Sequence, residues 1–175
     1  MEENYKDEMI VIDNVNRYNE IFRLETKHPL VSIIDLTKST TWPTRAWFRY
    51  EVYALFLKNV KCGDIKYGRQ YYDYQDGTIV CFGPGQITDL ELIQNIQPNA
   101  HGLLFHPDLI RGTSLGQEIK NYSFFSYETN EALHLSEEER QIVMDCLQKI
   151  AIELNHAIDR HSRRLICTNI RLLLD

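Results

Sequence analysis

The stretch between residues 71 and 86 constrains the fold more than any other part of the chain. Two runs rich in β-forming residues flank Asp76-Gly77, a dipeptide that favours the tight type I′ turn of a β-hairpin. The second run stops at Gly83-Pro84-Gly85, where proline lacks the N–H that a strand ladder needs. The stretch therefore predicts a hairpin over residues 71–82, with its tyrosine-rich arm in a barrel wall that faces an interior.

Other short strands are expected on both sides of this hairpin, without helical segments between them. Residues 49–58 alternate two apolar faces, one with Tyr50 and Phe56 and the other with Tyr53, so we expect one long strand covered on both sides. Strands spaced this closely indicate an antiparallel barrel or sandwich. A short helix is expected over 13–24, and further strands are expected over 28–36, 64–68, 87–93 and 102–105.

The C-terminal part of the chain changes to helical periodicity. Ser136, followed by three glutamates, has the pattern of a capping box and predicts a helix start. A second helix is expected from about residue 162. Its apolar residues continue almost to residue 175, so we expect this helix to continue in a longer protein and to pack on a partner helix in a dimer. The interface candidates are Ile150, Leu154, Ile158, Leu165, Leu172 and Leu173, although such a stripe is more often core than interface.

Composition limits the classes of protein to which the chain can belong. A hydrophobic fraction of 43% in 175 residues supports one domain with a core and room for a helical layer. The net charge of −6 argues against a chain that itself grips a phosphate backbone, which needs clustered lysine and arginine. The N-terminus lacks a signal-peptide pattern and no apolar run reaches 18 residues, so we expect a cytoplasmic protein without membrane contact.

The residues that usually carry catalysis or metal binding do not form a convincing pattern. No H-x-H pair occurs, and His101 and His106, five apart, would face opposite sides of one strand. Ser114 stands in a G-x-S-x-G sequence, but no parallel α/β pattern surrounds it, and a helix N-cap is the better interpretation. We therefore expect no catalytic residue, no metal, no cofactor and no enzyme.

Tyrosines are the strongest candidates for contact with a ligand. Tyr53, Tyr67, Tyr72 and Tyr74 come from segments that are expected to be neighbours. Tyrosine offers both a ring face and a hydroxyl, which suits a small polar or aromatic ligand. The alternative is an ordinary core in which these hydroxyls reach the surface.

Several short segments together resemble the N-terminal sensor and dimerisation domain of AraC-type transcription regulators, of the Bacteroides-like type. The resemblance extends from about residue 28 to the end of the chain. It is carried by residues 71–78 (YYDYQDGT), 84–86 (PGQ), 104–110 (LFHPDLI), 124–127 (FFSY) and 132–136 (ALHLS).

The resemblance implies a cupin-like antiparallel barrel (a double-stranded β-helix) over residues 1–127, with an N-terminal arm. Residues 128–175 would then be a helical segment that forms a homodimer, and a helix-turn-helix domain that binds DNA would follow beyond residue 175. His101 stands where relatives often carry tryptophan, which makes it a further candidate for ligand contact. A small-molecule effector would act by shifting the population of dimer arrangements.

Two other functions remain open at this point. A metal-free cupin enzyme, such as a sugar isomerase or epimerase, would need a histidine and a tyrosine or carboxylate that converge inside the barrel. A plain interaction module would have a collapsed core and no cavity.

Overall fold

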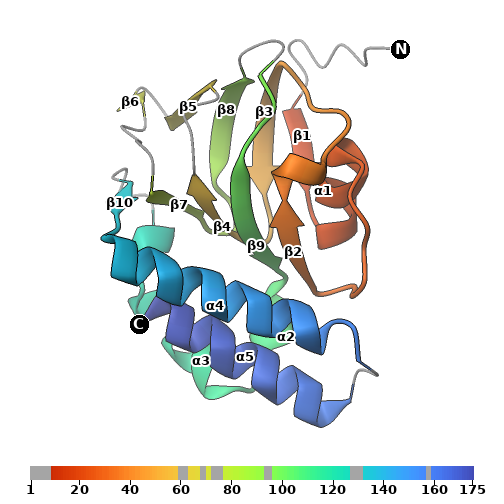
Figure 1. Ribbon diagram of the computed structural model, residues 1–175, viewed down its shortest axis with the longest axis vertical. Coiled ribbons are helices and arrows are strands. Elements are labelled where there is room, and N and C mark those ends of the chain that lie inside the picture. Colours follow the sequence, from red (N-terminus) through yellow and green to blue (C-terminus); the bar gives the residue numbers. More distant parts are fainter. Residues whose placement is uncertain are drawn as a thin grey trace.

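Figure 1 shows the computed structural model of the protein as two β-sheets stacked on a layer of helices. The structure describes residues 9–58, 63–67, 70–71, 77–92, 96–126, 132–156 and 159–175. The first sheet has the strand order β1-β3-β8-β5-β6, and the second has the order β10-β7-β4-β9-β2. Paired strands are antiparallel except for β1 and β3, which are parallel.

The elements follow one another along the chain as short strands and then as helices. The strands are β1 (Met9–Ile12), β2 (Val31–Asp35), β3 (Arg45–Tyr50), β4 (Tyr53–Lys58), β5 (Gly63–Tyr67), β6 (Gln70–Tyr71), β7 (Thr78–Phe82), β8 (Ile87–Leu92), β9 (Ala100–Phe105) and β10 (Leu133–His134). The helices are α1 (Val15–Phe22), α2 (Pro107–Ile110), α3 (Ser114–Glu118), α4 (Glu137–Glu153) and α5 (Arg160–Leu174), with 3₁₀ turns at Leu36–Lys38, Ile119–Asn121 and Ser123–Phe125.

The expected class, mainly β with C-terminal helices, is confirmed, but the expected barrel is not closed. The described strands form two separate sheets, and no ladder joins one sheet to the other among them. Successive strands mostly alternate between the two sheets, and two of these crossings are short breaks at residues 51–52 and 83–86. The second break contains Pro84 and a positive φ of 88° at Gly85, which end the ladder as expected.

The hairpin predicted over residues 71–82 is wrong. Its first arm, β6, pairs with β5 in the first sheet, whereas β7 pairs with β4 and β10 in the second. Gly77, at φ 77°, donates its N–H to the Lys58 carbonyl over 2.9 Å and so aligns β7 with β4. The turn residues 72–76 lie outside the described part of the chain.

The single strand predicted over residues 49–58 is also wrong, because it is two strands in different sheets. Its two faces are nevertheless as predicted. Tyr50, Val52, Ala54 and Phe56 lie in a core between the sheets, whereas Leu55 and Leu57 lie in a second core between the second sheet and the helices. We call these the interior core and the helix-side core.

The helix ends follow local hydrogen bonding. Ser136 and Glu139 form the predicted capping box at the start of α4. Asp159 caps α5, and hydrogen bonds from the Ser162 and His161 amides lower the pKa of its carboxyl group. Thr113, not the expected Ser114, is the N-cap of α3, because the Thr113 hydroxyl accepts the Gly116 N–H over 3.1 Å. Among the described helices, none combines the length and the hydropathy required to cross a membrane.

Gly102 permits the close approach of β9 and β4 in the interior core. A Cβ atom at this position would lie 2.6 Å from Cδ1 of the Phe56 ring and 2.7 Å from the Leu55 carbonyl oxygen. We therefore expect Gly102→Ala to lower the free energy of unfolding by about 2–3 kcal/mol, measured by urea denaturation. Adding Phe56→Leu should recover part of this loss, because it removes the ring that the new methyl group meets. Wild-type stability of Gly102→Ala would contradict this packing.

Candidate functional site

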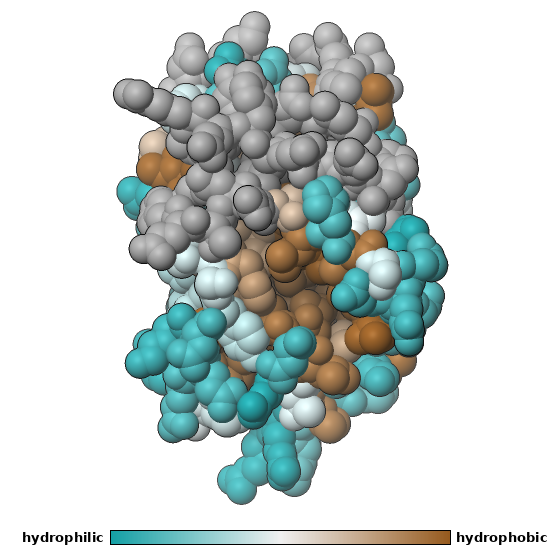
Figure 2. All heavy atoms as spheres, turned by 90° about the vertical axis from the view of Figure 1, so that its left-hand side faces the viewer, coloured by the Kyte–Doolittle hydropathy of each residue, from teal (hydrophilic) through white to brown (hydrophobic). Residues whose placement is uncertain are grey.

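A small cavity of about 20 Å³ lies within the interior core, between the two sheets. Its walls combine residues from α1, the turn after β2, and strands β3, β4, β7 and β8. Figure 2 looks onto the side of the molecule where β7 and β10 lie in Figure 1, and shows a hydrophobic hollow on that face. The cavity is lined by Tyr18, Phe22, Leu36, Tyr50, Phe56, Lys58, Phe82, Thr88, Leu90 and Leu92.

Stacked aromatic rings form much of this wall. The Tyr18 and Phe22 rings, one turn apart on α1, stack with their centroids 4.6 Å apart. The Tyr50 ring stacks on Phe82 with centroids 5.1 Å apart and an interplanar angle of 10°. These contacts join α1, β3 and β7, so that two tyrosine rings are fixed at the cavity by packing.

Three polar groups are buried at the cavity. Burial raises the pKa of Tyr50, opposed by its hydrogen bond with Thr88, so the phenol is neutral and can donate or accept a hydrogen bond. Lys58 is also buried, with its Nζ 5.7 Å from the centroid of the Phe56 ring, a cation–π distance. A cation, two hydroxyl groups and aromatic faces together suit a small polar or anionic ligand.

The volume of the cavity sets a condition on any ligand. A cavity of about 20 Å³ holds about one water molecule. A larger molecule could enter only if the aromatic side chains at the cavity changed rotamer.

The structure places two of the sequence-predicted ligand residues, Tyr53 and His101, away from the cavity. Tyr53 lies on the helix side of the second sheet, where its ring stacks on Phe105 at 5.0 Å and meets Phe125 edge-on at 5.1 Å. His101 lies on β9 opposite Asp35 of β2, with Nε2 3.7 Å from Asp35 Oδ1. The structure does not bring Tyr53 and His101 together at the cavity. The Tyr67 side chain and residues Tyr72 and Tyr74 lie outside the described part.

Sequence reasoning missed Tyr18, Lys58 and Thr88 as cavity residues. A signal for Lys58 was present, because the alternation that places Phe56 in the interior core continues to position 58. No local pattern distinguished Thr88, whose place depends on its pairing with Phe48 across β3 and β8.

The predicted dimer residues divide into a buried and an exposed group. Ile150 and Leu154 are buried in the helix-side core of their own chain, so they are not available to a second copy in this arrangement. Leu165 and Leu172 are 47% and 53% exposed on α5, and Leu173 is half-buried. Ile158 lies outside the described residues.

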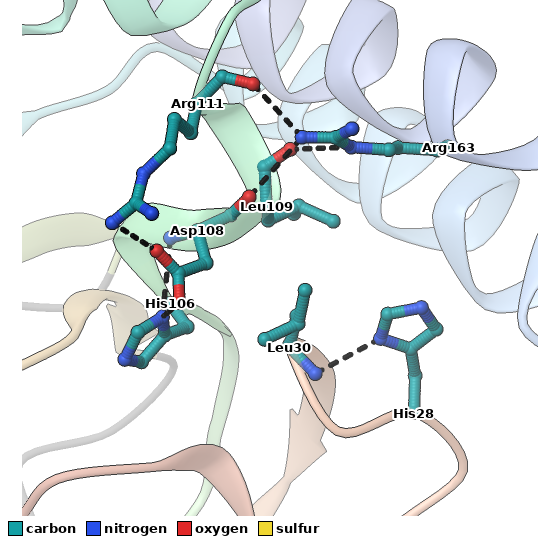
Figure 3. Close-up of polar contacts among 7 residues, drawn as sticks. All are labelled: His28, Leu30, His106, Asp108, Leu109, Arg111 and Arg163. Carbon is teal, nitrogen blue, oxygen red and sulfur yellow. Dashed lines mark hydrogen bonds and ion pairs between the residues drawn. The ribbon is translucent and has the colours of Figure 1, made fainter. Parts of the chain in front are cut away.

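Two histidines stabilise local turns (Figure 3). His28 Nδ1 accepts the Leu30 N–H over 2.9 Å, and burial lowers the pKa of His28. His106 Nδ1 accepts the Asp108 N–H over 3.1 Å and caps α2. Within the described residues, no group of three histidine, cysteine or acidic side chains could hold a metal ion.

Comparison with known proteins gives similarity to solved structures, at low sequence identity. No family model matches the sequence, and no curated protein matches it. Among solved structures, the chain is similar to the AraC-like transcriptional activator CuxR, with a TM-score of 0.44 and 12% sequence identity. The likeness covers 83% of this chain and 48% of that one, so it spans about half of the CuxR chain.

Proposed function

We propose that this chain is the ligand-sensing and dimerisation domain of an AraC-type transcription regulator, and that it controls a separate DNA-binding domain. The short sequence segments that resemble this family support the assignment to this class of regulator. The dimerisation part of the proposal rests on Leu165 and Leu172 of α5. Both are large apolar side chains that are about half exposed, and both lie outside the two cores.

The two leucines are seven residues apart on one helix. Seven residues are two turns, so both side chains lie on the same flank of α5. Another face of α5, with Ile166 and Ile170, is already buried within the same chain. A second copy of α5 would cover this leucine flank in an isologous contact, where each copy offers the same surface.

Strand β4 offers a route from the cavity to the helices. Phe56 and Lys58 line the cavity on one face of β4, and Leu55 and Leu57 contact the helix-side core on the other. An effector that entered the cavity would displace Phe56 or Lys58 and so bias the position of β4 under the helices. The effector would act to the extent that it bound one arrangement of the dimer more tightly than another.

The oligomeric state of charge variants on α5 tests this proposal. We expect the wild-type chain to sediment as a dimer, and Leu165→Glu/Leu172→Glu to raise the dimer dissociation constant by roughly 100-fold or more, since each buried leucine stabilises an interface. Trp47→Glu is the control, because Trp47 is a similarly exposed apolar residue in the first sheet.

Analytical ultracentrifugation across a range of protein concentrations measures both constants. A wild-type chain that stays monomeric at high concentration would contradict dimerisation. A double variant that dimerises as well as the wild type would place the interface away from the leucine flank.

A further inference from the structure

A second concave site lies in the helical layer, away from the interior cavity. It is a groove of about 440 Å³ between the start of α3 and one flank of α5, which lie beside each other in Figure 1. We call it the arginine groove. It is lined by Thr113, Ser114, Leu115, Arg160, Arg163, Arg164, Cys167, Thr168 and Arg171.

The charge of this groove is opposite to that of the whole chain. Four arginines and no acidic residue line it, although the net charge of the chain is −6. Arg171 is balanced by Glu118, with Nη2–Oε2 at 2.9 Å, and by Asp175 at 3.5 Å. Arg160 and Arg164 are exposed, and neither has an ion-pair partner among the residues that the structure describes.

Arg160 and Arg164 also repel each other. They are four residues apart, so they are neighbours on one face of α5, where like charges destabilise a helix. Arg163 adds a third positive charge beside them, because its guanidinium donates to backbone carbonyl groups and no carboxylate neutralises it among the residues that the structure describes. A bound anion would remove this repulsion.

The chemistry of the lining suits the oxygen atoms of phosphate groups. Guanidinium groups present paired N–H donors that match phosphate oxygens, and they stay charged at every physiological pH. Thr113 and Ser114 bring hydroxyl-bearing residues from α3 to the other wall of the groove, and Ser114 is exposed. The Thr113 and Thr168 hydroxyls donate to backbone carbonyls, whereas the Ser114 hydroxyl makes no hydrogen bond among the residues that the structure describes.

We propose that the arginine groove binds a small ligand that carries a diphosphate or two phosphate groups. A concave groove between two helices can enclose such a ligand. Duplex DNA would meet the negative field of the whole chain, whereas a small ligand inside the groove meets mainly the nearby arginines. This site is distinct from the interior cavity, and it lies on a different flank of α5 from Leu165 and Leu172.

Isothermal titration calorimetry with inorganic pyrophosphate, at constant ionic strength, tests the proposal. We expect binding to the wild-type chain, and a roughly 10-fold loss of affinity in Arg164→Gln and in Arg160→Gln, because each variant removes a charge-assisted contact. Arg17→Gln is the matched control. It removes the same charge from an exposed position on α1 and should leave the affinity unchanged.

Three results would overturn the proposal. They are the absence of pyrophosphate binding to the wild-type chain, an equal loss of affinity in Arg17→Gln, and tighter binding of a duplex DNA or an acidic peptide than of pyrophosphate. Since all three arginines substituted are exposed, the variants should fold, and circular dichroism verifies this before titration. Dimerisation is measured in a separate experiment, so a negative result for pyrophosphate binding would not contradict the proposed function.

Discussion

Replacing Phe48 with alanine should lower the free energy of unfolding by about 3–5 kcal/mol, the range for removal of a buried phenylalanine. Phe48 is fully buried in the interior core. Its ring centroid is 6.4 Å from that of Phe22 and 6.2 Å from that of Tyr50, so it connects α1 to the tyrosine at the cavity. The loss combines the transfer energy of the ring with the void that it leaves.

The neighbouring residue supplies the control for this experiment. Trp47 is on the same strand but points to the other face, and it is 40% exposed. Trp47→Ala should cost about 1 kcal/mol or less, although it removes a larger ring, because a partly exposed side chain loses less burial. Urea denaturation of both variants measures the difference. Equal losses would mean that the two faces of β3 are not divided as described.

The second large effect concerns Arg163, which fastens α5 to the segment around α2 (Figure 3). Its Nε donates to the Leu109 carbonyl over 2.9 Å, and its Nη2 donates to the carbonyls of Asp108 and Arg111 over 3.1 and 3.0 Å. Arg163→Ala should lower the free energy of unfolding by about 2–4 kcal/mol, because it leaves three carbonyl oxygens without this donor. Thermal and urea unfolding measure the change.

Two further variants separate the geometry of Arg163 from its charge. Arg163→Lys keeps the charge but loses the planar fork, so it should retain less than half of the stabilisation. Arg164→Ala removes the same charge from the exposed neighbouring position and should change stability by about 0.5 kcal/mol or less. If Arg163→Lys were as stable as the wild type, charge alone would account for the contact.

Local signals predicted much of the secondary structure. The Ser136 capping box and the stop at Gly83-Pro84-Gly85 depend on residues a few positions apart, and both are present as expected. Alternation also assigned the two faces of residues 49–58 correctly, because side-chain direction along an extended chain depends only on position.

The choice of pairing partner could not be predicted in the same way. Asp76-Gly77 favours a hairpin locally, yet β7 pairs with β4, which is some twenty residues earlier in the chain. That pairing is fixed by the buried side chains that two distant strands share. The candidate site was missed for the same reason, since the cavity draws Tyr18, Lys58 and Thr88 from three separate elements.

The position of β4 has a consequence for how the domain unfolds. This strand lies between β7 and β9 and supplies alternate side chains to the interior core and to the helix-side core. A register shift of one residue would reverse both sets at once. Because both cores pack on this one strand, we expect the sheets and the helical layer to unfold together as one cooperative unit.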